Sequence, residues 1–156
     1  MAYTAEPIPG LIIKTLLDTE WDQSLQQKIP KPNIREVGEE LRVDIKLGDT
    51  AKDWVEIAVT PAGEREMWRG NWTYADITVE LQIKIFTAVS RQRLYDLKQQ
   101  IRRIIRVNQD NREYLGDIYQ VVRYLRFVET VTGKIKNWEG VCFCQIEAAG
   151  LDMEQS

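Results

Sequence analysis

Pairs of carboxylates are the residues in this sequence whose types and spacing come closest to an acid–base site. Glu39 and Glu40 are adjacent, and Glu64 and Glu66 are two positions apart, so each pair could supply the acid and the base of a hydrolytic reaction. However, neighbouring acids in a polar stretch more often face solvent, and the chain contains no phosphate-binding loop and no dinucleotide fingerprint. We therefore predict no catalytic residue, and an enzyme is the least favoured of three classes of function.

Histidine is absent from the chain, which removes the usual Ser-His and Cys-His nucleophiles and every imidazole metal ligand. The two cysteines, Cys142 and Cys144, occupy a strand-like run in which their thiols share one face. Their Cα atoms would lie about 6.6–6.8 Å apart from the rise of a strand, at the upper limit for a disulfide. A zinc site would need two further ligands. We predict two buried, reduced thiols typical of a cytosolic protein, with no metal and no cofactor.

A run of cations gives the sequence its most distinctive surface. Residues 91–112 hold seven basic and two acidic residues, so this segment carries +5 and the remainder −8 within a formal net charge of −3. In the helix predicted here, Arg102, Arg103 and Arg106 project on one side together with Tyr95 and Gln99. Such a charge split predicts a surface that meets something acidic, such as the acidic part of an identical neighbour.

Three tryptophans, Trp54, Trp68 and Trp72, lie close together in the sequence. Residues 64–72, which contain two of them, read either as a ragged strand or as a long hairpin loop. The indole rings would serve either in packing of the core and hairpin or as anchors at a subunit contact. Trp68 and Trp72 are therefore candidate hairpin contacts with a neighbouring subunit.

The element that must organise these residues is a strand over residues 77–87. Apolar residues occupy its odd positions from Ile77 to Ile85 and polar residues its even positions, so one face is dry and the other wet. This pattern favours an antiparallel or mixed sheet. Ser90 offers a helix N-cap, and the helix that follows has a single apolar stripe, which we expect to pack on the dry face: Leu94, Leu97, Ile101, Ile104 and Ile105.

The N-terminal half predicts one helix and two strands. Residues 1–33 form a helix over residues 11–26 and an extended connector, because apolar positions recur from Leu11 to Leu25 before Pro30 and Pro32. Alternation predicts strands over residues 34–47 and 54–60. Residues 61–63, Pro-Ala-Gly, then predict a turn that closes the second strand.

The C-terminal part predicts a long hairpin. Residues 118–131 form a strand that is apolar on both faces, with Arg123 interrupting one face and Arg126 the other. A second subunit is the natural cover for such a strand, so both arginines are candidate interface residues. Residues 135–148 form the returning strand, in which Glu139 and Gly140 fit a bulge. Residues 149–156 are expected to form a mobile tail.

Length and composition predict one domain over residues 1–156. With 44% hydrophobic and 29% charged residues, 156 residues can bury one core. The order of elements predicts an α+β fold with a mixed or antiparallel sheet and helices packed on one face. No signal peptide or transmembrane run is recognisable, and we expect no membrane association.

This arrangement resembles the tail-terminator, or tail-completion, proteins of long-tailed bacteriophages and related neck proteins. The likeness is one of element order and length over residues 11–25, 53–60, 65–72 leading into 77–87, 90–107 and 118–148. It implies a virion protein, assembled in the host cytoplasm, whose copies close into a ring that is typically a hexamer. The implied partners are further copies, the tail tube protein and the head–tail connector proteins.

Two classes of function are therefore favoured over catalysis. The first is a ring subunit that caps the tail tube and joins it to the head connector. The second is a nucleic-acid-binding α+β module that uses the basic helix over residues 91–106, with arginines on phosphates and Tyr95 stacking on a base. The overall acidic charge and the lack of a recognised nucleic-acid signature disfavour the second class. The two classes merge if the basic helix faces DNA passing through the ring.

Overall fold

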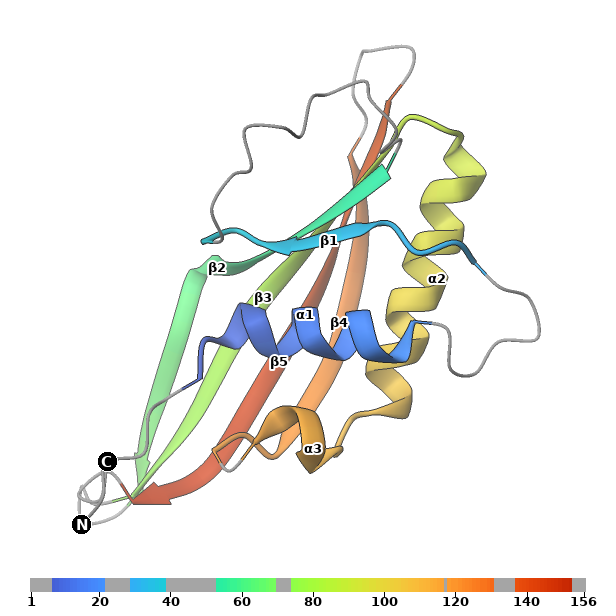
Figure 1. Cartoon of the computed structure of the whole chain (residues 1–156). Coiled ribbons are helices and arrows are strands. Elements are labelled where there is room, and N and C mark those ends of the chain that lie inside the picture. The colour runs from blue at the N-terminus through green and yellow to red at the C-terminus, as the bar shows by residue number, and fades with distance from the viewer. Residues whose placement is uncertain are drawn as a thin grey trace.

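Among the described residues, the fold is a five-stranded sheet with three helices against one of its faces (Figure 1). The computed structural model describes residues 7–21, 29–38, 53–69, 74–116, 118–130 and 137–152. In chain order the elements are α1 (Pro9–Glu20), β1 (Asn33–Glu36), β2 (Asp53–Arg69), β3 (Tyr74–Thr87), α2 (Arg91–Val107), α3 (Arg112–Leu115), β4 (Val121–Thr130) and β5 (Trp138–Asp152). The strand order is β1-β2-β3-β5-β4. Because β1 pairs parallel with β2 and the other pairs are antiparallel, the sheet is mixed, and the predicted α+β class is confirmed.

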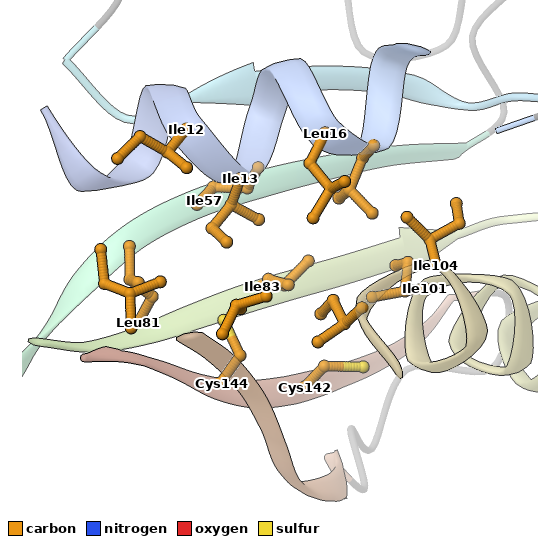
Figure 2. Close-up of a cluster of buried hydrophobic side chains, with 14 of the residues drawn as sticks. Ile12, Ile13, Leu16, Ile57, Leu81, Ile83, Ile101, Ile104, Cys142 and Cys144 are labelled. Carbon is orange, nitrogen blue, oxygen red and sulfur yellow. The ribbon is translucent and has the colours of Figure 1, made fainter. Parts of the chain in front are cut away.

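The core lies between the helices and the dry face of β3, as the sequence pattern predicts. The apolar odd positions of β3 from Ile77 to Ile85 are at most 5% exposed, because alternate side chains of a strand point to the same face. The apolar stripe of α2 is buried against this face, and Ile101 of α2 and Ile83 of β3 belong to the same buried cluster (Figure 2). Ser90 caps α2, since its hydroxyl accepts a hydrogen bond from the Arg93 backbone N–H at 3.1 Å. The predicted central strand and helix are both confirmed.

Helix α1 also packs against the covered face of the sheet. It starts at Pro9, a residue suited to the first helical position, and buries Ile12, Ile13, Leu16 and Leu17. Trp21 follows the helix and donates its indole N–H to the Ile29 carbonyl at 2.8 Å. The predicted continuation to residue 26 lies outside the described residues.

Strand β2 is longer than predicted, because the expected turn at residues 61–63 is absorbed into the strand. Pairing with β3 continues on both sides of a register shift between Val59 and Glu64. Gly63 has a φ of 63°, a conformation that costs glycine little, so the turn residues produce a bulge instead of a reversal. For residues 64–69 the strand alternative is confirmed over the loop. The strand predicted over residues 34–47 is shorter, since β1 ends at Glu36 and a turn follows; residues 39–52 lie outside the described part.

Strand β4 has one covered and one open face, and the prediction that Arg123 and Arg126 interrupt opposite faces is wrong. Its pairing with β5 shifts register between Tyr124 and Arg126. The extra residue, Leu125, moves Phe127 to the covered face and places Arg126 on the same open face as Arg123. Regular alternation had assigned Arg123 and Arg126 to opposite faces.

The returning strand β5 also differs from the prediction. Residues 138–148 pair with β3 without interruption, so the bulge expected at Glu139 and Gly140 is absent there. Pairing then continues to Asp152 opposite Tyr74, and residues 149–152 are therefore strand and not tail; residues 153–156 lie outside the described part. The polar residues that follow α2 include the short helix α3, in which the Asn111 side chain caps the helix by accepting a hydrogen bond from the Glu113 backbone N–H.

Candidate functional site

The basic side of α2 forms a cationic seam along β4. We define this seam as Lys98, Arg102 and Arg106 together with the aromatic rings of Tyr95, Tyr124 and Phe127. The Lys98 Nζ lies 4.9 Å from the centroid of the Tyr95 ring and 5.3 Å from that of Phe127. The Arg106 Cζ lies 5.9 Å from the centroid of the Tyr124 ring. Because the three cations are four residues apart, they share one side of the helix.

Tyr95 is held by contacts within the protein. Its hydroxyl donates to Glu129 at 2.6 Å, and its ring meets Phe127 edge-on with centroids 5.7 Å apart. Glu129 also accepts two hydrogen bonds from Arg91, which lower the pKa of the Glu129 carboxyl and raise that of the Arg91 guanidinium. The hydrogen bond to Glu129 raises the pKa of Tyr95 as well. Tyr95 therefore joins α2 to β4, and its ring is already covered on one side.

The seam cations have no carboxylate partner among the residues that the structure describes. Within the described part of the chain, no ion pair forms at Lys98, Arg102 or Arg106. Other arginines of α2 do have carboxylate partners, since Arg91 pairs with Glu129 and Arg93 with Asp53 at 2.8 Å. Arg103 is half-buried and already engaged in an interaction within the protein. Of the three predicted arginines, the structure thus brings Arg102 and Arg106 together with Tyr95 in the seam and leaves Arg103 beside it.

The two cysteines lie under this seam, on the covered face of β5. Both are free and buried, as the sequence predicts. Burial raises the pKa of the Cys142 thiol to about 12 and also raises that of Cys144. The Tyr124 hydroxyl lies 3.8 Å from the Cys142 Sγ, and burial raises the pKa of this hydroxyl. Since the thiolate is the reactive form, these cysteines are packing groups at neutral pH.

Within the described part of the chain, no helix packs against the opposite face of the sheet. This open face carries several pairs of oppositely charged side chains. Arg35 binds Glu56 at 2.6 Å and lies over the Trp54 ring. Arg123 binds Glu147 at 2.7 Å. Arg126 lies 4.1 Å from the centroid of the Phe143 ring and 3.8 Å from a Glu80 oxygen. Arg123 and Arg126 are therefore neighbours on the open face, where they cover aromatic and carboxylate groups.

A groove of about 640 Å³ hollows this open face. It crosses β2, β3, β5 and the start of β4, and its charged lining residues are four carboxylates and two guanidiniums: Glu66, Asp76, Glu80, Glu147, Arg65 and Arg123. On β3, alternation places the Asp76 and Glu80 side chains on the open face, between buried neighbours. Glu66 pairs with Ile77 of the covered face, so its side chain points to the helix side. Arg126 and Arg123 face Glu80 and Glu147, so acidic and basic groups are close to balance along the groove.

Of the two predicted tryptophan contacts, only Trp68 can be placed, and it belongs neither to the seam nor to the lining of the groove. Trp68 is 40% exposed near the end of β2, beside Met67 at 71%. Trp72 lies outside the described residues. Strand β1 pairs only with residues 54–57 of β2, so within the described part of the chain the outer edge of β2 beyond Ile57 has no neighbouring strand.

Sequence reasoning missed Lys98, Tyr124, Phe127 and the groove carboxylates. The sequence does indicate Lys98, since it precedes Arg102 by four residues, as Arg102 precedes Arg106, and so lies on the same side of the helix. The sequence does not indicate Phe127, because a bulge decides which face of β4 this residue occupies. The groove carboxylates come from three separate strands, and only the sheet order brings them together.

Among the described residues, no group of three or more His, Cys, Asp or Glu side chains is placed to hold a metal ion. No helix in the described part is long and apolar enough to cross a membrane. Comparison with known protein families and with curated proteins finds no match to this chain.

Proposed function

We propose that this chain is a structural virion protein without catalytic activity, whose copies form a ring. In this role the ring caps the tail tube and joins it to the head connector, as the resemblance to tail-terminator proteins implies. The observation that carries the proposal is the open face of the sheet, opposite all three helices (Figure 1). Open faces and free strand edges are the surfaces through which copies of a β-containing protein associate.

The chemistry of this face supports contact with another protein. Aromatic and aliphatic groups lie among its charged pairs: Trp54 stacks on Phe86 with ring centroids 5.4 Å apart, and Val128 is 47% exposed. The edge of β2 beyond Ile57, which has no neighbouring strand among the described residues, continues beside this face and ends near the exposed Met67 and Trp68. Apolar anchors with a polar surround are typical of protein interfaces.

The test is the size of the purified protein at micromolar concentration, measured by light scattering alone and with the tail tube protein. We expect a closed oligomer, visible as rings by electron microscopy, either alone or once the tube is present. A strictly monomeric protein under both conditions would contradict the proposal.

The cationic seam supports the second candidate, a nucleic-acid-binding module. Lys98, Arg102 and Arg106 lie on one side of α2 without carboxylate partners in the described part of the chain, and such a row of cations can follow a phosphate backbone. Replacing Arg102, Arg103 and Arg106 with Glu separates the two candidates. A nucleic-acid-binding protein would lose salt-sensitive DNA affinity in fluorescence anisotropy, whereas a ring subunit would lose assembly.

A further inference from the structure

We propose that the outer edge of β2 in one copy pairs with the outer edge of β4 in the next copy, which brings Glu66 to the cationic seam. This inference rests on the proposed ring and names its subunit contact. Its occupant is a second copy of this chain, because every copy has one of these edges at each end of its sheet and the two edges carry opposite charge on the helix side.

The two edges are described parts of the sheet without a further strand beside them. Strand β4 is the last in the strand order, and β1 pairs only with residues 54–57 of β2, so among the described residues the outer edge of β2 beyond Ile57 is unpaired. Such edges present backbone N–H and C=O groups that can pair with another strand. The start of the β4 edge is closed, because the Val122 N–H donates to the Gln109 carbonyl at 2.8 Å. We therefore place the contact between residues 124–130 of β4 and residues 64–69 of β2.

The strand directions allow the sheet to continue from copy to copy. The pairs β2–β3, β3–β5 and β5–β4 are all antiparallel, so β2 runs opposite to β4. A neighbour rotated about an axis along the strands keeps these directions, and its β2 meets β4 in the antiparallel sense with both sets of helices on the same side. Because the contact joins two different edges, it is head-to-tail and closes into a ring when the rotation per subunit allows it.

The seam lies on the flank of α2 that faces the outer edge of β4. On the other flank of α2, the Gln100 side chain donates a hydrogen bond to the carbonyl of Trp21, the residue that follows α1. The seam residues Lys98 and Arg106 instead lie over aromatic rings of β4, the outermost strand. A strand added beside β4 would therefore run beside the seam.

Glu66 is the carboxylate that this contact brings to the seam. It is exposed and forms no ion pair among the described residues. Its partner in the sheet is Ile77, which is 5% exposed on the covered face, so Glu66 points to the helix side. The free carboxylate and the seam cations thus lie on the same side of the continued sheet.

Direction and spacing match the two edges. Helix α2 runs antiparallel to β4, since Arg91 binds Glu129 and, farther along the helix, Arg106 lies beside Tyr124. The β2 strand of the neighbour would therefore run parallel to α2. Two residues of a strand advance about 6.8 Å, close to the roughly 6 Å that four residues of a helix advance.

This match defines a register for the contact. With Trp68 opposite Tyr124, both side chains lie on the helix side, and Arg106 can contact both rings. Two positions earlier, Glu66 then lies beside the stretch of α2 between Lys98 and Arg102. Two β2 edges paired with each other around residues 64–66 would instead place glutamates opposite glutamates, which is unfavourable.

The first test reverses charge on each side of the contact. Glu66→Lys and Arg102→Glu should each weaken assembly of the full chain about tenfold in light scattering, because like charges then meet. A chain with both substitutions should assemble more strongly than the Glu66→Lys chain, since opposite charges meet again. The matched controls are Glu113→Lys and Arg112→Glu at exposed positions of α3, and they should assemble as the unmodified protein does.

The second test locates the contact by cross-linking. A Glu66→Cys chain and an Arg102→Cys chain are mixed in equal amounts and treated with a short bismaleimide, while Cys142 and Cys144 are protected by burial. The mixture should give a covalent dimer that neither chain gives alone. Replacing the Arg102→Cys chain with an Arg112→Cys chain should abolish this dimer.

The outcomes separate this contact from the ring proposal. If the unmodified protein forms oligomers but both charge reversals leave assembly unchanged, or the mixed cysteine chains give no dimer, the contact is wrong and the ring proposal stands. If a reversed chain fails to fold by circular dichroism, Glu66→Gln and Arg102→Gln replace the reversals, and unchanged assembly of both overturns the contact. A monomeric unmodified protein, with and without the tube, overturns both proposals. Loss of DNA affinity in the Arg102→Glu chain with unchanged assembly would assign the seam to nucleic acid and overturn the contact.

Discussion

Phe127 and Gly140 show how a single side chain depends on the position opposite it. Gly140 pairs with Glu129 across β4 and β5, and the space where its side chain would lie is filled by the tip of the Phe127 ring. The ring can lie there because the bulge at Leu125 turns Phe127 to the covered face. Gly140, which the sequence suggests as part of a bulge, instead leaves room for the ring of Phe127.

Gly140→Ala should therefore destabilise the fold by about 1–3 kcal/mol, since the added methyl group overlaps the Phe127 ring and forces it to move. Urea unfolding followed by circular dichroism measures this cost. In the Phe127→Ala background the same substitution should cost clearly less, because the overlap is gone. Equal costs in the two backgrounds would contradict this account of Gly140.

The Arg91–Glu129–Tyr95 cluster predicts a pH dependence. The Glu129 carboxyl has a pKa lowered by its hydrogen bond to Arg91, so it stabilises the fold above the ordinary glutamate pKa of about 4.3 and loses this effect as pH falls through the lowered value. Glu129→Gln should lower the thermal midpoint at pH 7, and the difference from the unmodified protein should shrink as the pH is lowered through the depressed pKa of Glu129. Glu113→Gln, at an exposed position, serves as control and should change little at neutral or low pH.

The two buried cysteines should react slowly with thiol reagents. Because burial raises the pKa of Cys142 to about 12 and raises that of Cys144 too, almost no thiolate is present at pH 8. Ellman's reagent should react with the native protein only at the rate of unfolding and with both thiols at once in urea. Fast reaction of either thiol with the native protein would show that the β5 thiols are accessible.

At the scale of elements, the start of α2 is positioned by both a cap and an ion pair. Ser90 caps the helix, and Arg93 binds Asp53 of β2 at 2.8 Å and the Pro30 carbonyl at 2.5 Å. These contacts connect the helix to β2 and to the segment before β1. They set the direction in which α2 runs along β4, and hence the position of the seam.

Ser90→Ala should cost about 1 kcal/mol of stability, because the Arg93 backbone N–H loses its acceptor. Urea unfolding gives the free energy. Ser90→Asp, which keeps an acceptor oxygen at the cap, should retain most of the stability. If Ser90→Ala leaves the free energy of unfolding unchanged, the start of the helix is held mainly by Arg93 and its partners.

The two bulges are the elements that sequence patterns predicted least well. In β2 the signal was present, since Pro61 and Gly63 break the alternation, but the same residues are equally typical of a hairpin turn. In β4 nothing in the sequence marks Leu125 as the extra residue. A bulge is chosen by how well each strand pairs with its neighbours on both sides, so it depends on residues distant in the chain.

At the scale of the whole molecule, the seam cations, which have no carboxylate partner among the described residues, predict salt-sensitive assembly. If these cations contact an acidic surface of another subunit, raising NaCl from about 50 mM to about 500 mM should weaken assembly, because the Debye length shortens to a few ångströms. Light scattering across a concentration series at each salt measures this. Assembly that strengthens with salt would show instead that apolar contacts, such as those at Met67 and Trp68, dominate.

The chain's own pattern determined the central unit of this protein. Alternation in residues 77–87, the cap at Ser90 and the stripe that follows it predicted β3, α2 and the face on which they meet. These features depend on periodicity and on residues a few positions apart, and a buried apolar face admits only one register of the strand. The fold class followed from the order of such units.

Tertiary structure alone decided which charges meet. The sequence already places Arg102 and Arg106 on one helix side, but only the packing of α2 against β4 puts the Tyr124 ring beneath Arg106. Likewise, the order β2-β3-β5-β4 gathers carboxylates from three strands into one groove. Strand order and bulges are set by the summed free energy of pairing and burial over the entire sheet, and no local stretch of sequence contains that sum.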